Sequence, residues 1–225
     1  MKRSQINAQI READAFLRLH GWYLPPFAYW TPEDWRERRT EAAHLISARV
    51  GWDITDFGEG NYARKGLFLF TVRNGDLADL RSGRGRVYCE KLLIADIEQM
   101  TPLHYHWSKT EDIINRAGGV LAVQVFNTTA DHKLADTPVE LMVDGLTRRV
   151  EAGAILELQP GESVTLVPGV YHAFWAVHEK VLIGEVSTVN DDANDNKFFE
   201  SIGRFPTIEE DEPALHLLVS DYDRL

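Results

Sequence analysis

The chain has 225 residues, with 35 acidic against 24 basic side chains and a formal net charge of -11. This length allows one substantial hydrophobic core with an extension, and it is short for two full domains. The negative charge argues against nucleic acid and anionic membrane surfaces as partners, because their phosphates would be repelled. The single cysteine, Cys89, excludes an internal disulfide, and no apolar run reaches the roughly 20 residues of a membrane span. We expect a cytoplasmic protein.

Helical patterns occupy the N-terminal part of the chain. Apolar residues recur at spacings of four and three after Ser4, which predicts an amphipathic helix over 4–20 with Ser4 as its N-cap. The proline-rich segment 22–30 cannot be helical. Pro32, preceded by a threonine cap and followed by two acids, begins a second helix that is predicted to run to about Arg49.

From residue 67 the pattern changes to short β-rich runs separated by turn residues, which predicts a mainly β fold. The expected strands are 67–73, 86–96, 99–106, 112–116, 120–127, 139–143, 147–150, 154–158, 163–167, 171–177 and 181–189. We therefore predict one jelly-roll barrel over 61–225, with a two-helix extension over 1–60 packed on it. The polar segment 190–196 is expected to be a loop that could fold over the mouth of the barrel.

Two histidine-bearing segments predict a metal site. His104 and His106 are two residues apart, so on a strand both imidazoles point to one face. Glu111 can return from the next strand, and His172 follows a Pro-Gly turn far downstream. Three imidazoles and one carboxylate suit a divalent ion such as Mn²⁺, Fe²⁺, Ni²⁺ or Zn²⁺ and leave coordination positions open. The alternative is that the histidines line a barrel interior and bind Glu111 without a metal.

These two segments, 104–118 and 161–172, resemble the two sequence motifs of the cupin superfamily. The resemblance implies a small β-barrel with a central metal ion. By that resemblance the four ligands are His104, His106, Glu111 and His172. Two positions depart from the usual pattern. Pro168 directly precedes the glycine of the second motif, and Ala176 replaces a frequent polar residue, but neither change touches a ligand.

Four further residues are candidates for the chemistry. Lys109 lies between two ligand positions and could stabilise a substrate oxygen, or it could be a solvent-facing turn residue. Glu185 interrupts an apolar strand and is a candidate general base if it faces inward, or it could be an outward carboxylate. Phe174 should point inward by parity with His172, where it could contact a sugar or belong to the core. Arg204 could contact a substrate hydroxyl, although holding the Asp-rich loop is the favoured interpretation.

The wider sequence is similar to the cupin-type bacterial D-lyxose isomerases over nearly its whole length. The segments that carry the similarity are 24–30, 104–111, 172–175, 184–192 and 202–206. The resemblance implies an enzyme that uses manganese to interconvert D-lyxose and D-xylulose, often accepting D-mannose and D-fructose. Fe²⁺, Zn²⁺, Ni²⁺ and Co²⁺ are the alternative metals, and we expect a homodimer because cupins commonly associate through their sheets.

Exchange between an aldose and a ketose moves a proton between C1 and C2, so it needs a base, an acid and a group that polarises the adjacent oxygens. A metal with two open positions can hold O1 and O2 of the open-chain sugar. We expect a cis-enediol path with Glu185 as base and Lys109 as its partner, and a metal-assisted hydride shift is the other route. The alternative functions are a phosphosugar isomerase, an iron dioxygenase and a non-catalytic sugar-binding cupin.

Overall fold

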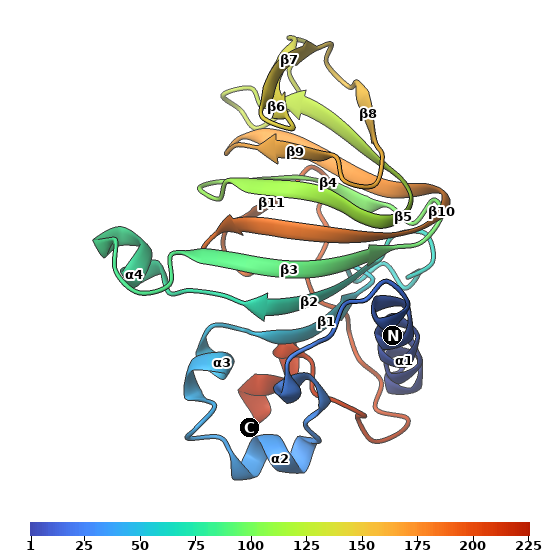
Figure 1. The fold of residues 1–225 in the computed structure, drawn as a ribbon, viewed down its shortest axis with the longest axis vertical. Coiled ribbons are helices and arrows are strands. Elements are labelled where there is room, and N and C mark those ends of the chain that lie inside the picture. The colour runs from blue at the N-terminus through green and yellow to red at the C-terminus, as the bar shows by residue number, and fades with distance from the viewer.

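The computed structural model describes all residues, 1–225. Its strands form one continuous 11-stranded antiparallel sheet, which two long shared strands divide into two parts, called here the two sheets (Figure 1). The strands are β1 (Gly51–Thr55), β2 (Leu67–Arg73), β3 (Tyr88–Ala95), β4 (Thr101–His106), β5 (Glu111–Asn127), β6 (Val139–Val143), β7 (Leu146–Val150), β8 (Ile155–Leu158), β9 (Ser163–Leu166), β10 (Val170–Thr188) and β11 (Asn196–Phe198). The helices are α1 (Arg3–Leu19), α2 (Pro32–Glu37), α3 (Ala43–Ser47) and α4 (Leu77–Ser82), with 3₁₀ turns at Pro26–Tyr29 and Val219–Arg224. The mainly β class with a helical N-terminus is as predicted. None of the helices has both the length and the apolar character needed to cross a membrane.

The shared strands β5 and β10 pair with each other along most of their length. The first half of β5 and the second half of β10 lie in one sheet, where β10 pairs with β3 and β5 pairs with β9. The other halves lie in the second sheet, where β10 pairs with β4 and β5 pairs with β8. Strand β11 completes this second sheet along the free edge of β4. The two sheets therefore face each other and enclose the interior of a barrel.

Both shared strands bend at the same level. Gly118 has a positive φ of 92°, and a Cβ there would lie 2.1 Å from the backbone oxygen of Lys180. The pairing register of β10 shifts between Val177 and Val181, opposite this glycine. Each bend falls at a gap between two predicted strands. The predicted strands 112–116 and 120–127 are one bent strand, β5, and 171–177 and 181–189 are another, β10. The turn residues that predicted strand ends instead mark places where a continuous strand changes sheet.

Side chains alternate between two hydrophobic clusters. Along β2 and β3, one set of residues, including Leu69 and Leu93, faces the barrel interior. The intervening residues, including Phe70 and Leu92, pack against α1 on the outer face. Helix α1 lies beside this face in Figure 1 and buries the apolar stripe that its sequence predicts. The interior of the barrel thus holds the larger apolar cluster, of 20 buried residues, together with polar groups at one end.

Two predictions about the helices are wrong in detail. Helix α1 begins at Arg3, so Ser4 lies within it and is not its N-cap. The helix predicted from Pro32 to Arg49 is two short helices, α2 and α3. Residues 38–41, which follow α2, are all exposed, so no packing stabilises a continuous helix there.

Three elements lie outside the predicted ones: β1, α4 and β11. Strand β1 falls within the 1–60 segment and pairs with β2 along its whole length. The division of the chain into an extension and a barrel at residue 60 stays a prediction.

The first helix is fastened to the C-terminal segment by a buried ion pair. Both terminal nitrogens of Arg3 donate to the carboxylate of Asp221 at 2.9 Å, and Arg3 also contacts Glu210 at 2.7 Å. The Arg3 and Asp221 side chains are only 2% and 7% exposed. Removing the cation would leave the Asp221 carboxylate buried without its charged partner.

We expect Arg3→Met to lower the free energy of unfolding by about 3 kcal/mol, because breaking a buried ion pair costs more than the pair contributes. Urea denaturation followed by tryptophan fluorescence measures the change. Arg224→Met is the matched control, because Arg224 reaches the same Glu210 at 3.4 Å from an exposed position. The control should change stability by about 0.5 kcal/mol or less. Equal losses of unfolding free energy in the two variants would contradict the stabilising role of the buried Arg3–Asp221 pair.

Candidate active site

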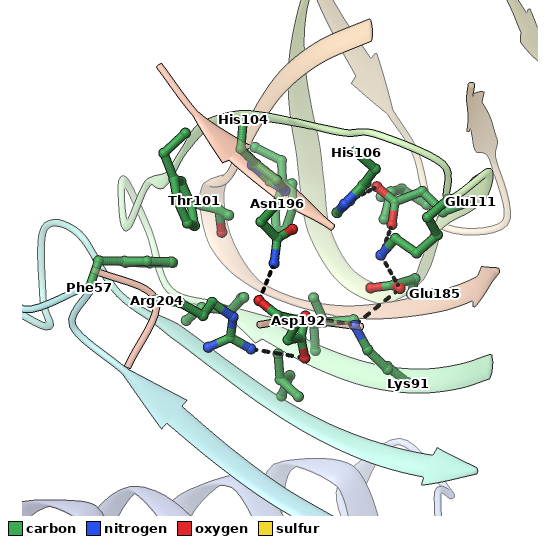
Figure 2. A pocket seen from close by; sticks show the side chains of 17 residues that line it. Phe57, Lys91, Thr101, His104, His106, Glu111, Glu185, Asp192, Asn196 and Arg204 are labelled. Atoms are coloured by element: carbon green, nitrogen blue, oxygen red, sulfur yellow. Dashed lines mark hydrogen bonds and ion pairs between the residues drawn. The ribbon is translucent and has the colours of Figure 1, made fainter. Parts of the chain in front are cut away.

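A pocket opens at the polar end of the barrel, between the two sheets (Figure 2). Its lining residues are Phe57, Leu67, Leu69, Lys91, Leu93, Thr101, His104, His106, Lys109, Glu111, Ile113, Phe174, Glu185, Asp192, Asn196, Phe198 and Arg204. Seven of the eight predicted site residues are among them, and His172 lies beside His104 as its direct neighbour on β10. The structure therefore brings all eight predicted residues together at one place.

Three imidazoles form a cluster within the site. His104 and His172 face each other across the pairing of β4 with β10, and His106 follows on the same face of β4. One ligand nitrogen of each ring lies within 4.8 Å of the others. All three side chains are buried. This cluster can hold a metal ion.

Backbone carbonyls fix the tautomers of the three rings. The Nδ1 atoms of His104 and His172 lie 2.7 Å from Pro102 O and 3.0 Å from Val170 O, and that of His106 lies 3.3 Å from Asp195 O. Because a carbonyl oxygen only accepts, each Nδ1 must carry the hydrogen, and each Nε2 keeps a free lone pair. The Nε2 atoms of His106 and His172 are buried without a hydrogen-bond partner. Such a second contact at Nδ1 is usual for metal-binding histidines.

The carboxylate of Glu111 lies next to two of these lone pairs. Its Oε1 is 3.3 Å from Nε2 of His106 and 3.0 Å from Nε2 of His172. A carboxylate oxygen and an unprotonated Nε2 repel each other unless a cation lies between them. The donor set therefore fits a divalent metal, which accepts neutral imidazoles and a carboxylate.

The ionisation states of the histidines and of Glu111 also favour a divalent metal. Burial lowers the pKa of His104 and of His106, so both rings stay neutral near pH 7. Burial alone would raise the pKa of Glu111, but the positive charge of Lys109 and the nearby His106 ring outweigh it and hold that pKa well below its usual range. Neutral imidazoles and an ionised carboxylate are the forms that bind metals.

Lys109 is a buried residue of the site rather than a solvent-facing one. Its ammonium lies 2.6 Å from Glu111 and 2.8 Å from Glu185. The turn that carries it is held by Asp195, whose carboxylate accepts from the backbone N–H groups of Ser108 and Lys109 at 2.9 Å and 3.0 Å. Burial disfavours the ammonium, but Glu111 and Glu185 raise the pKa of Lys109 above its usual value. It remains a cation at every physiological pH.

Beyond Lys109 the buried charges alternate in sign across the pocket. Glu185 faces inward and lies 3.3 Å from Lys91, which lies 3.5 Å from Asp192. Arg204 then contacts Asp192 at 3.2 Å and Asp53 at 2.6 Å. In order, the alternating chain is Glu111, Lys109, Glu185, Lys91, Asp192, Arg204 and Asp53. Arg204 thus holds the Asp-rich loop, and Phe174 also lines the pocket.

Several site residues were missed by sequence reasoning. Asp53 carried a usable signal, because it is the single charge of an otherwise apolar strand, whereas Lys91 follows Glu90 directly in β3 and carried a weaker one. Asp192 and Asp195 carried none, because every residue of the segment 190–196 except Ala193 is Asn or Asp. Only the pairing of β11 with β4 brings that segment to the histidines.

Comparisons with known proteins agree over nearly the full chain. A model of the D-lyxose isomerase family matches residues 1–222. The D-lyxose/D-mannose isomerase of Escherichia coli O157:H7 is 43% identical over 99% of this chain and 98% of its own. The D-lyxose/D-mannose isomerase of Serratia proteamaculans is 43% identical over 100% of this chain and 99% of its own.

Solved structures share the fold at low identity. The L-ribose isomerase of Acinetobacter sp. DL28 superimposes with a TM-score of 0.61 at 15% identity, over 93% of this chain and 98% of that one. The L-ribose isomerase of Cellulomonas parahominis gives 0.58 at 16% identity over the same shares.

The fold and these relatives define an aldose–ketose isomerase on a cupin-like barrel. The chain belongs to the D-lyxose isomerase family.

We expect metal-free protein to bind Mn²⁺ and His172→Ala to bind it at least about tenfold more weakly, because the cluster loses one of its lone pairs. Titration calorimetry measures both affinities. His44→Ala is the control, because His44 is an exposed residue of α3 far from β4 and β10. Unchanged affinity in His172→Ala would show that the ion binds elsewhere.

Proposed function

We propose that the protein interconverts D-lyxose with D-xylulose, and D-mannose with D-fructose, as a Mn²⁺-dependent enzyme of the cytoplasm. The proposed ligands are His104, His106, Glu111 and His172. When bound, the metal supplies Lewis acidity that polarises the carbonyl and the adjacent hydroxyl of the open-chain sugar. The names of the two relatives at 43% identity support the choice of sugars.

One observation carries the proposal: a carboxylate and an ammonium meet beside the histidine cluster, inside the pocket. Glu185 accepts from Lys109 at 2.8 Å, and both side chains are at most 5% exposed. Both lysine contacts of Glu185 use Oε1, so Oε2 is left to accept a proton. Isomerisation needs such an acceptor and a nearby cation.

In the proposed path Glu185 removes the proton from C2 of the aldose. The electron pair forms the C1–C2 double bond of a cis-enediol, while O1 gains a proton from the Lys109 ammonium. Glu185 then returns a proton to C1, and the hydroxyl at C2 gives its proton to Lys109 and becomes the carbonyl of the ketose. Lys109 stabilises the negative charge that develops on the oxygens, because its ammonium is fixed in a dry site.

The pocket wall offers contacts for the rest of the sugar. Phe174 and Phe198 present aromatic surface that suits the C–H faces of a sugar. Nη1 of Arg204 and the hydroxyl of Thr101 are buried without hydrogen-bond partners, and both residues line the pocket. Unpaired buried polar groups are costly, so a sugar hydroxyl that pairs with them would bind favourably.

The charges of the pocket disfavour a phosphosugar. Each cation that lines it, Lys91, Lys109 and Arg204, already pairs with at least one carboxylate. A phosphate would have to compete with Glu185 and Asp192 for these cations and would be repelled by both. A free sugar meets no such repulsion.

We expect the protein with Mn²⁺ to convert D-lyxose and D-mannose to their ketoses. Glu185→Gln should lower kcat by about 100- to 10,000-fold, because the amide cannot take the C2 proton. Glu111→Ala should lower both activity and bound Mn²⁺, measured by ketose assay and elemental analysis. Activity on fructose 6-phosphate with none on free sugars would overturn the proposal.

The path can be tested with substrate deuterated at C2. A cis-enediol formed by Glu185 predicts that part of the deuterium is lost to water, because the base exchanges its proton with solvent during turnover. Nuclear magnetic resonance of the ketose at C1 measures the retained label. Complete transfer to C1, with no solvent hydrogen incorporated, would favour the hydride shift.

A further inference from the structure

Lys91 is a buried cation of the pocket to which the proposed reaction gives no role. It lies on β3 in the run Cys89–Ala95 and is 2% exposed. Its ammonium lies 3.3 Å from Glu185 and 3.5 Å from Asp192. It also donates to the side-chain oxygen of Asn190 at 2.6 Å. Lys91 contacts none of the proposed metal ligands.

These contacts join the two halves of the site. Glu185 belongs to the rigid strand β10, which also carries His172. Asn190 and Asp192 belong to the loop 190–195, which follows β10 and precedes β11. Lys91 lies between Glu185 and Asp192 in the alternating chain, with a contact to each (Figure 2).

On its outer side the loop 190–195 is held at its first residue, where the side chain of Asn74 makes two hydrogen bonds to the backbone of Asn190. A second cavity of about 600 Å³ lies there, and Asn190, Asp191, Asp192 and Ala193 line it. On the inner side, Asp192 faces the reaction pocket. The loop therefore separates two cavities, and beyond Asn190 its position depends on the side chains that hold it from within. For Asp192 these are Arg204 and Lys91.

We propose that Lys91 is a positioning residue for the isomerisation: its ammonium, shared by Glu185 and by Asn190 and Asp192 of the loop, fixes the base and the loop in one arrangement. This inference rests on the proposed function. Without the ammonium, two carboxylates would face each other across an empty position and repel. Glu185 would then rotate toward Lys109 alone, and the loop would move toward the second cavity.

The test compares three variants of Lys91 for kcat, KM, metal content and amide hydrogen exchange of the loop. Lys91→Gln and Lys91→Met should lower kcat by about 100-fold, the effect of misplacing a reacting group by about 1 Å. KM should change less than kcat, and Mn²⁺ content should stay unchanged. Lys91→Arg, which keeps the positive charge, should have a kcat at least tenfold higher than the Gln and Met variants. Loop amides should exchange faster in the Gln and Met variants alone.

Arg3→Met is the matched control, because it also breaks a buried ion pair but at the first residue of α1, which does not line the reaction pocket. It should keep kcat within about twofold, even at an equal loss of stability. Lys91→Gln keeps a donor for Asn190 and carries the test if the methionine variant does not fold. A kcat within about threefold of wild type in Lys91→Gln, or an equal kcat loss in Arg3→Met, overturns the proposal. If wild-type protein isomerises no sugar, the proposed function fails, and the loop exchange alone then decides whether Lys91 holds the loop.

Discussion

The site depends on one electrostatic constraint: charges removed from water must be paired. Seven ionisable side chains alternate in sign from Glu111 to Asp53, and none of them is highly exposed. A buried charge without a partner costs several kcal/mol, so no member of this chain can be removed without disturbing the next. The four carboxylates and three cations of this chain leave a net charge of -1. A divalent ion beside Glu111 would change that net charge to +1. The barrel thus keeps a polar interior in a folded protein.

The bends of β5 and β10 make room for this interior. Because each long strand belongs to both sheets, the sheets diverge at the end where Glu111 and His172 lie. Gly118 allows the two backbones to approach at the bend, where any side chain would collide with Lys180. The same backbone geometry that closes the barrel therefore directs residues of both sheets at one pocket.

The sequence predicted the parts of the site that depend on local order. The His104–His106 spacing, the parity of Phe174 with His172 and the polar interruption at Glu185 all follow from the period of a strand. Asp192 and Asp195 could not be predicted, because their roles arise when β11 pairs with β4. The broken second helix was missed because helix patterns extend readily through exposed polar residues, whereas packing decides whether the helix persists.

The clamp between α1 and the C-terminal segment has a consequence for synthesis of the chain. Arg3 and Asp221 are separated by 218 positions, and Ser4 binds Asp211 across 207. Helix α1 therefore meets these two carboxylates only after more than 200 further residues have been made. Until then its apolar stripe can pack on the outer face of β2 and β3, but these two contacts cannot hold it there. Synthesis of the segment that contains Asp211 and Asp221, rather than emergence of the barrel strands, sets the moment at which α1 is fixed in place.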